Sequence, residues 1–557
     1  MNRFYSNLFL FSKVVISLCF FCWTNTSLSQ EKEKPNYGQV HGNFEMNIQY
    51  YNEDSLIGAK QPPEKMLMSG FANVIYTNGN FEAGIRYESY LNALQGFPTA
   101  YKGNGIPFKY VSFHKDNLSM TAGNFYEQFG SGMILRAYES RGLGYDNAFE
   151  GFRASYKPIN GVVLKGLIGK QRKYFTTSEG IVRGVDGEIN ISELSDSLAD
   201  MKTKIILGGS FVSKFQADQN SQFVLPENVG SWAGRMNIIN GGINFYTEYV
   251  YKINDPSADN GFIYKPGDAL LTQISYSTKG FGISLSGKRN DNMSFRSERD
   301  AALTDVLINY IPTLTKQHTY NLLATLYPYA TQPNGEVGYQ AEANYQFKKE
   351  SFLGGKYGTS LLVNYSEVRN LDTIRLNDET TNRIGYTSDY FGFNGQVYFK
   401  ELYAEITKKF SKKVKGTFAY ANQIFNIEVI QGKPGKPTIY SNTAIIDITY
   451  KINLKHAIRT ELQALLTKQD KQDWATALIE YTFSPHWFVA VMDQYNYGNK
   501  KTQERVHYYN GSVGYVNKGN RFMVTYGRQR AGIFCVGGVC RNVPAANGLI
   551  FTVTSSF

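Results

Sequence analysis

Cysteine and histidine are the residue types of this sequence best suited to metal or nucleophilic chemistry, and their spacing offers little of either. Two of the four cysteines lie in an N-terminal apolar stretch, and the other two, Cys535 and Cys540, enclose the turn Val-Gly-Gly-Val. Glycine allows a turn tight enough to bring two sulfurs together. Two thiols without a nearby histidine cannot complete a zinc site. We therefore predict a structural disulfide that stiffens an exposed loop, with a metal site or a redox switch as the weaker alternatives.

The six histidines do not form a recognisable site. No two of them have metal-ligand spacing, and none adjoins a serine or aspartate nucleophile pattern; they are His41, His114, His318, His456, His486 and His507. We expect no catalytic residue, no metal, no cofactor and no enzymatic activity. An outer-membrane hydrolase is the alternative, because catalytic groups of such barrels converge only in space.

The composition narrows the class of protein. Aromatic residues make up 15% of the 557 residues, which argues against disorder, and only 19% are charged. Beyond the N-terminus, no apolar run approaches the roughly 18 residues of a spanning helix. A chain that is rich in glycine and tyrosine without such helices is typical of a transmembrane β-barrel.

The N-terminus predicts export. Residues 1–29 contain Arg3 and Lys13, an apolar core at 14–23 and a small-x-small site at 27–29, which together have the form of a signal peptide. We predict a short N-terminal segment at 30–36 and a barrel over 37–557, with no room for a plug domain before the first strand. In the oxidising compartment that this route reaches, a cysteine pair forms a disulfide.

Most of the remaining chain alternates in polarity. Apolar residues occupy every second position from Phe81 to Tyr87, and Glu82, Gly84 and Arg86 lie between them. Successive side chains of a strand point to opposite faces, so one face is apolar and the other polar. The alternation recurs at 243–253, 337–347, 444–451 and 458–464. We predict that the polar face lines a lumen and contains Glu82, Arg86, Glu88, Glu248, Lys252, Glu342, Asp447, Lys451, Arg459 and Glu461.

Turn lengths distinguish a barrel from a soluble sandwich. Short turns such as 78–79, 240–242 and 279–280 alternate with long connections such as 92–105, 129–147, 254–267, 291–334, 370–394 and 531–547. Short periplasmic turns on one rim and long extracellular loops on the other are typical of outer-membrane barrels. The fold class is therefore all-β, a single transmembrane antiparallel β-barrel of about 24 strands, within a range of 20–26. The number of strands is least certain at 176–230 and at 291–334. Within 291–334, residues 318–329 form either a strand or a loop.

Two long connections are candidates for folding into the lumen. A barrel this wide without a plug would be an open pore. Residues 291–334 combine a charged stretch with an aromatic and proline-rich one, and residues 129–147 carry the loop charges Arg136, Glu139, Arg141 and Asp146. These charges either bind a solute or pair with lumen-facing groups, and we favour pairing because charges in a closed interior need partners.

The final strand carries an assembly signal of its own. Leu549, Phe551 and Val553 alternate with polar residues, and the chain ends on Phe557. This strand resembles the targeting strand that the barrel-assembly machinery of Gram-negative outer membranes recognises.

Two stretches resemble an uncharacterised family of Bacteroidota outer-membrane barrels of unknown function. One is 123–130 (GNFYEQFG) with Asp146-Asn147, and the other runs from 526–530 (YGRQR) through the cysteine loop to Pro544 and Gly548. The resemblance covers nearly the whole mature chain, and the cysteine loop is its most specific part. It implies an outer-membrane barrel and no functional residues.

Two functions follow from this class. The first is a porin-like channel that carries small solutes across the outer membrane, and the alternative is a scaffolding barrel in a secretion or surface-assembly complex. The net charge of +11 suits contact with lipopolysaccharide phosphates better than with nucleic acid, which an exported chain does not meet. The expected partners are outer-membrane lipid and lipopolysaccharide, the barrel-assembly machinery and other envelope proteins.

Overall fold

The computed structural model describes residues 37–377 and 382–557, so the predicted signal peptide (1–29) and the segment 30–36 lie outside the described residues. Twenty-four strands form one sheet. They are β1 (Gln39–Asn52), β2 (Met66–Asn78), β3 (Phe81–Leu91), β4 (Gly103–Lys115), β5 (Leu118–Phe125), β10 (Phe149–Tyr156), β11 (Val162–Lys173), β12 (Thr176–Asn190), β13 (Thr203–Phe215), β14 (Asn228–Asn240), β15 (Ile243–Lys252), β16 (Gly267–Thr278), β17 (Phe281–Asp291), β18 (Gly335–Phe347), β19 (Thr359–Arg369), β22 (Val397–Lys409), β23 (Val414–Phe425), β24 (Ile439–Lys451), β25 (His456–Thr467), β26 (Trp474–Phe483), β27 (Trp487–Tyr495), β28 (His507–Asn517), β29 (Asn520–Gln529) and β32 (Ala546–Ser556).

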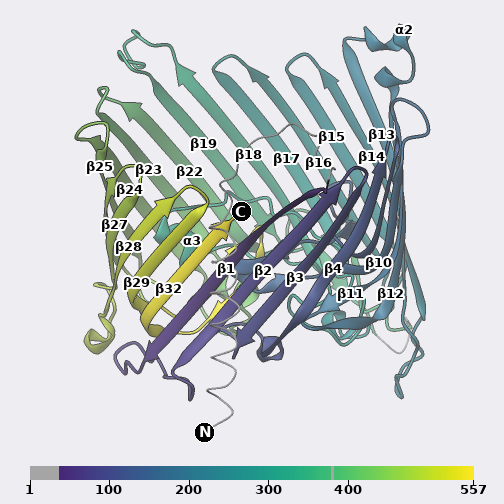
Figure 1. Ribbon diagram of the computed structural model, residues 1–557, viewed down its shortest axis with the longest axis horizontal. Coiled ribbons are helices and arrows are strands. Elements are labelled where there is room, and N and C mark those ends of the chain that lie inside the picture. Colours follow the sequence, from purple (N-terminus) through teal and green to yellow (C-terminus); the bar gives the residue numbers. More distant parts are fainter. Residues whose placement is uncertain (1–36, 378–381) are drawn as a thin grey trace. The chain divides into compact units, whose positions relative to one another are not determined.

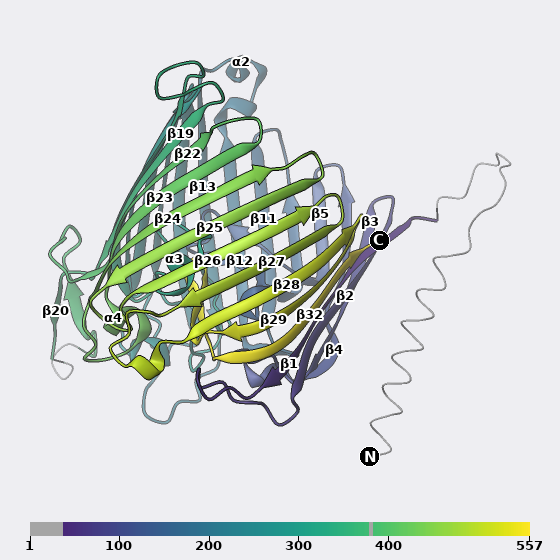
Figure 2. The same cartoon turned by 90° about the vertical axis from the view of Figure 1, so that its left-hand side faces the viewer.

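The sheet closes on itself. Each strand pairs antiparallel with the next strand of the sheet along the chain, and β1 pairs with β32, with Met46 opposite Val553. Figure 1 shows the tilted strands of the front and back walls, and Figure 2 shows the wall from β22 to β29. Closure leaves no unpaired strand edge. The prediction of one antiparallel barrel with about 24 strands is confirmed.

The alternation of polarity separates the two faces of the wall. In β15, Tyr249 and Tyr251 are 43% and 40% exposed, whereas Glu248 and Lys252, which point to the opposite face, are fully buried. The same contrast separates exposed Leu462 from buried Glu461 in β25. The apolar face is therefore the outside of the barrel, and the polar face points into the lumen.

The two rims differ in their connections. At one rim, which we call the short-turn rim, most strands are joined by tight turns such as 79–80, 241–242 and 279–280. At the other, the long-loop rim, the connections include 53–65, 92–102, 126–148, 253–266, 292–334, 370–396 and 530–545. Three connections depart from the predicted asymmetry. A two-residue turn at 174–175 lies on the long-loop rim, and the longer segments 191–202 and 348–358 lie on the short-turn rim.

Short elements complete the chain. Four two-stranded ribbons or bridges lie in the long connections: β6 (Gln128–Phe129) with β7 (Leu135–Arg136), β8 (Glu139–Ser140) with β9 (Tyr145–Asp146), β20 (Thr373–Arg375) with β21 (Tyr386–Ser388), and β30 (Gly532–Val536) with β31 (Val539–Val543). The helical turns are η1 (Thr99–Tyr101), η2 (Arg141–Leu143), η3 (Ile191–Glu193), α2 (Asp196–Ala199), η4 (Ala258–Asn260), α3 (Asn321–Thr325), α4 (Ile427–Gln431) and η5 (Thr502–Glu504). Within 37–377 and 382–557, no helix has the length and apolar character needed to cross a membrane.

One long connection contacts two walls of the barrel. Residues 292–334, which we call the plug segment, place Phe295 and Ile308 in a buried cluster with residues of β11 to β16. Further along, Leu322 and Tyr327 belong to a second cluster with residues of β19 to β28. A single segment that touches both walls must cross the interior, and α3 lies inside the ring of strands in both views (Figures 1 and 2). Residues 318–329 are thus a loop that contains α3 rather than a barrel strand.

Candidate functional site

The plug segment is attached to the inner wall by buried polar contacts. Lys252 of β15 donates to the Ser294 carbonyl at 2.6 Å. Gln171 of β11 donates to the Leu307 carbonyl at 2.7 Å. Lys214 of β13 donates to the Arg296 carbonyl at 2.9 Å and also lies 2.7 Å from a carboxylate oxygen of Asp255 in 253–266. A buried backbone carbonyl is costly without a donor, so these side chains fix where the plug segment can lie.

A second inward connection, residues 126–148, packs against the plug segment. Met133, Ile134 and Leu135 are fully buried in the same cluster as Phe295. Arg136 accordingly donates its backbone N–H to the Ile308 carbonyl at 2.8 Å. The wall side chain of Glu248 accepts a hydrogen bond from the Ser131 backbone at 2.8 Å. The two connections therefore form one packed body inside the barrel.

The predicted loop charges pair with the wall in a buried ionic network. Glu88 of β3 lies 2.7 Å from Arg86 Nε and 2.5 Å from Arg172 Nη2, and Asp146 lies 2.6 Å from Arg172 Nη1. Arg86 also contacts Asp146 and Glu139. The side chains of Arg86, Glu88 and Arg172 are at most 4% exposed, so each charge depends on its partners.

The other two loop charges, Arg141 and Arg136, contact acidic and aromatic side chains, respectively. Arg141 is 2.7 Å from Glu45 and 3.0 Å from Glu139. The guanidinium of Arg136 stacks 4.2 Å from the ring centre of Tyr310, within the range of a cation–π contact. These charges hold the loop in place through contacts inside the protein.

The remaining predicted lumen residues lie nearer the short-turn rim. Arg459 bridges the two acids Asp447 and Glu461, and Lys451 is exposed at the end of β24. The two other predicted acids also have partners: Glu82 accepts from the Tyr110 hydroxyl at 2.7 Å, and Glu342 lies 3.3 Å from Lys316. Only Lys316 in this group belongs to the plug segment.

Burial along single strands shows where the interior is filled. The inward positions of β24 near the long-loop rim are buried, and those near the short-turn rim become accessible: Ile439, Ser441, Thr443 and Ile445 against Asp447, Thr449 and Lys451. In β16, Leu271 is buried whereas Gln273 and Ser277 are exposed on the same face. The loops therefore fill the long-loop half of the lumen, and a polar vestibule remains in the other half.

The cysteines are disulfide-bonded and lie opposite each other in the β30–β31 ribbon. We call residues 530–545 the Cys hairpin. Phe534 and Val536 of this hairpin are 37% and 45% exposed, and its turn docks on the plug segment. The Tyr310 hydroxyl donates to the Gly537 carbonyl at 2.6 Å, and the Thr331 backbone N–H donates to the Gly538 carbonyl at 3.1 Å. Arg541 donates to the Gly142 carbonyl at 3.0 Å. The hairpin therefore joins both inward connections.

Two glycines make this docking possible. Gly537 and Gly538 have φ values of +57° and +80°, in the left-handed region that favours glycine. A Cβ at Gly538 would lie 2.4 Å from Thr331 Oγ1. A side chain at either position would push the hairpin away from the plug segment.

Two plug tyrosines remain hydrogen-bond donors. Burial raises the pKa of Tyr327 and of Tyr329 above the ordinary value, and the neighbouring Asp470 and Glu336 raise the two pKa values further. The Tyr327 hydroxyl donates to Asp470 at 3.3 Å, and that of Tyr329 donates to Glu336. These contacts secure the plug segment at any physiological pH.

The histidines are separated from one another. His318 of the plug segment forms a buried hydrogen bond with Glu401 of β22 at 2.9 Å. His507 bonds Asp493 at 2.6 Å, and His114 bonds the Ser119 hydroxyl at 2.9 Å. No histidine of the described chain has both a hydroxyl and a carboxylate partner. In the same residues, no group of three His, Cys, Asp or Glu side chains could hold a metal ion.

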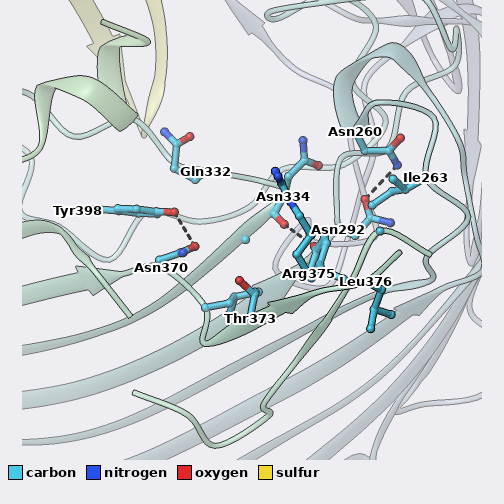
Figure 3. Close-up of a pocket in the computed structure, with 14 residues that line it drawn as sticks. Asn260, Ile263, Asn292, Gln332, Asn334, Asn370, Thr373, Arg375, Leu376 and Tyr398 are labelled. Atoms are coloured by element: carbon cyan, nitrogen blue, oxygen red, sulfur yellow. Dashed lines mark hydrogen bonds between the residues drawn. The ribbon is translucent and has the colours of Figure 1, made fainter. Parts of the chain in front are cut away.

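A pocket of about 610 Å³ opens among three connections of the long-loop rim, namely 253–266, 292–334 and 370–396. Five of its lining residues carry carboxamides: Asn260, Asn292, Gln332, Asn334 and Asn370. Figure 3 shows Asn260 and Asn292 on one side of the space and Asn370 with Tyr398 on the other. Among the residues that the structure describes, the lining contains no aspartate or glutamate, and Arg375 is its single charged residue. The pocket is therefore polar and nearly neutral.

The fold and these contacts define a β-barrel whose lumen is partly filled by its own loops. Within that class, residues 8–557 match the model of a family of unknown function (DUF6029), and the chain belongs to this family. No curated protein sequence matches it.

Three solved structures are similar to the chain at low sequence identity. The siderophore receptor PirA from Pseudomonas aeruginosa is 9% identical at a TM-score of 0.40, over 94% of this chain and 81% of that one. The outer membrane protein opdK from Pseudomonas aeruginosa is 10% identical at a TM-score of 0.35, over 82% and 99%. OccK3 (OpdO) of the same organism is 12% identical at 0.35, over 77% and 96%. At this distance the likeness carries no argument about function.

Proposed function

We propose that this protein resides in the outer membrane of a Gram-negative bacterium and passes small polar solutes along a route controlled by its inward loops. The closed barrel and its apolar exterior support the location, because backbone groups in lipid must be satisfied within the sheet. The predicted signal peptide and the sequence resemblance to Bacteroidota barrels support export and a Bacteroidota origin.

The observation that carries the function is the contrast between the two halves of the lumen. Buried contacts fill the long-loop half, whereas polar side chains line an accessible vestibule in the other half. A barrel of 24 strands is wide enough for an aqueous channel when nothing fills it. We therefore expect solute passage to require displacement of the plug segment.

Excision of the plug segment tests this proposal. Its ends are adjacent, because the Met293 backbone N–H donates to the Pro333 carbonyl at 2.9 Å and that of Asn292 donates to the Asn334 carbonyl at 3.1 Å. Residues 295–331 can thus be replaced by a short Gly-Ser linker without separating β17 from β18. We expect a quiet wild-type barrel and large stepwise conductance from the excised variant in planar bilayers.

The matched control removes residues 195–200, which lie in the 191–202 connection on the short-turn rim and are mostly exposed. It should conduct like the wild type. Heat-modifiable migration in SDS gels would verify that each barrel is folded. A folded excised variant that stays as quiet as the wild type would contradict the proposed route.

A scaffolding barrel is the second candidate, and one exposed connection favours it. In 370–396, Ile374, Phe391 and Phe393 are 70%, 78% and 53% exposed. Apolar side chains at an exposed loop tip suit contact with another envelope protein. Mild-detergent extraction from native membranes should then yield a stable complex that the triple alanine variant loses. Recovery of the barrel alone would count against this function.

The expected membrane partners are also proposals. At the long-loop end of the outer face, Lys400 and Arg369 flank Glu367. These cations suit the phosphates of lipopolysaccharide. Phe557, whose backbone bonds Gly42 in both directions at 3.0 Å, completes the strand proposed as the signal for the barrel-assembly machinery.

A further inference from the structure

The carboxamide pocket on the long-loop rim has fixed walls. Asn260 donates to Asn292 Oδ1 at 3.0 Å, and Asn292 in turn donates to the Lys265 carbonyl at 2.6 Å. Asn334 donates to the Asp259 carbonyl at 2.7 Å. These bonds tie 253–266 to the plug segment, so this side of the pocket is formed before any ligand arrives.

The opposite side of the pocket keeps open hydrogen-bonding groups. The Tyr398 hydroxyl donates to Asn370 Oδ1 at 2.6 Å, which orients the amide and leaves Asn370 Nδ2 without a partner among the described residues (Figure 3). Gln332 donates through Nε2 to the Ala330 carbonyl at 2.9 Å, so its Oε1 remains an acceptor. Arg375 is exposed and makes no side-chain hydrogen bond or ion pair within the described chain. Two hydrogen-bond donors, Asn370 Nδ2 and the Arg375 guanidinium, and one acceptor, Gln332 Oε1, therefore line the same pocket.

The chemistry of this lining selects a class of ligand. A carboxamide donates and accepts from one planar group, and a hydroxyl does the same from one atom. An anion would call for several cations or backbone N–H groups, whereas Arg375 is the single charge among the described lining residues. A cation would call for carboxylates, and the described part of the lining contains none. A volume of about 610 Å³ lies within the usual range for small-molecule sites.

We infer that this pocket binds a neutral, hydroxyl-rich ligand, a short oligosaccharide. Asn370 Nδ2 and the Arg375 guanidinium donate to sugar oxygens, and Gln332 Oε1 accepts from a sugar hydroxyl. The inference deepens the proposed function, on which it rests for its biological use, by naming the solute class that the barrel meets at its long-loop rim. The pocket lies between the plug segment and 370–396, so a bound sugar contacts the segment whose displacement opens the lumen.

Isothermal titration of the full-length barrel in detergent tests the inference. The probes are maltotriose and raffinose as neutral sugars and trigalacturonate as a charged one. We expect the neutral sugars to bind and the charged one to bind more weakly or not at all. Loss of one hydrogen bond in Arg375→Ala or Asn370→Ala should raise the Kd about five- to tenfold.

The matched control is Asn117→Ala, which removes a carboxamide from the turn between β4 and β5 on the short-turn rim and should leave the Kd unchanged. Arg375 is exposed, so its substitution keeps the test valid even where Asn370→Ala disturbs Tyr398. Three results would each overturn the inference. The first is no binding of either neutral sugar at 20 mM, which corresponds to roughly −2 kcal/mol of binding free energy. The others are tighter binding of trigalacturonate than of the neutral sugars, or equal Kd values in the wild type and both pocket variants. The titration does not depend on conductance. Sugar binding can therefore be absent while excision of the plug segment still opens the barrel, and sugar can bind while excision leaves the barrel closed.

Discussion

Lys214 offers the sharpest test of how the plug segment is held. Its ammonium group is fully buried, lies 2.7 Å from Asp255 and donates to the Arg296 carbonyl at 2.9 Å. It thus ties β13 to the plug segment and to 253–266 at once. Replacement by methionine keeps the volume and removes the charge, which leaves a buried carboxylate and a buried carbonyl without their donor.

Removing one partner of a buried ion pair costs about 3–5 kcal/mol. We expect this cost to appear in the equilibrium between docked and released plug segment, because Lys214 reaches the segment directly through Arg296. A change of this size is roughly a hundredfold to a few thousandfold in that equilibrium. Hydrogen-exchange mass spectrometry of peptides from 293–311 should therefore show faster exchange by about that factor in Lys214→Met.

Two companion variants make the test specific. Lys204 lies on the same strand and the same face but is exposed, so Lys204→Met should leave exchange of 293–311 unchanged. The double variant Lys214→Met with Asp255→Leu removes both charges, and replacing a complete buried pair by apolar residues is close to neutral. It should recover most of the lost protection. Unchanged exchange in Lys214→Met, or no recovery in the double variant, would refute the assignment of Lys214 as a tether.

Three further expectations concern other contacts of the interior. Gly538→Val, which forces a side chain against Thr331, should release the Cys hairpin and expose it to limited proteolysis, whereas wild-type resistance in this variant would contradict the docking. Glu88→Ala should lower the temperature at which heat-modifiable migration is lost, since it leaves two buried guanidinium groups short of a partner at a cost of about 3–5 kcal/mol. An unchanged transition would mean that water or a neighbouring acid replaces the carboxylate. Deletion of Phe557 should reduce the amount of folded barrel in outer-membrane fractions, and equal amounts would refute its role as an assembly signal.

The architecture could be predicted from the sequence because it depends on local patterns. A strand that faces lipid on one side and protein or water on the other must alternate in polarity, and this period is visible at Phe81–Leu91 and in most other strands. Turn residues then fix where each strand ends. The strand count was weakest at 176–230, and this stretch contains β12 and β13, which the longer connection 191–202 joins on the short-turn rim.

The interior could not be predicted in the same way, since its contacts join residues far apart in sequence. Arg172 belongs to the ionic network, yet strict alternation along β11 would place it on the outer face with Ile168, and only a register shift between Lys170 and Arg172 turns it inward. No local signal pairs Lys214 with Asp255 or docks the Cys hairpin on Tyr310.

Strand periodicity therefore determined the barrel, its strand number and the two faces of its wall, because each strand meets the same two environments along its whole length. Tertiary structure alone decided that the long-loop half of the lumen is filled and that carboxamides from three connections surround one pocket. Loop side chains follow no repeating environment, so only packing in three dimensions selects their partners.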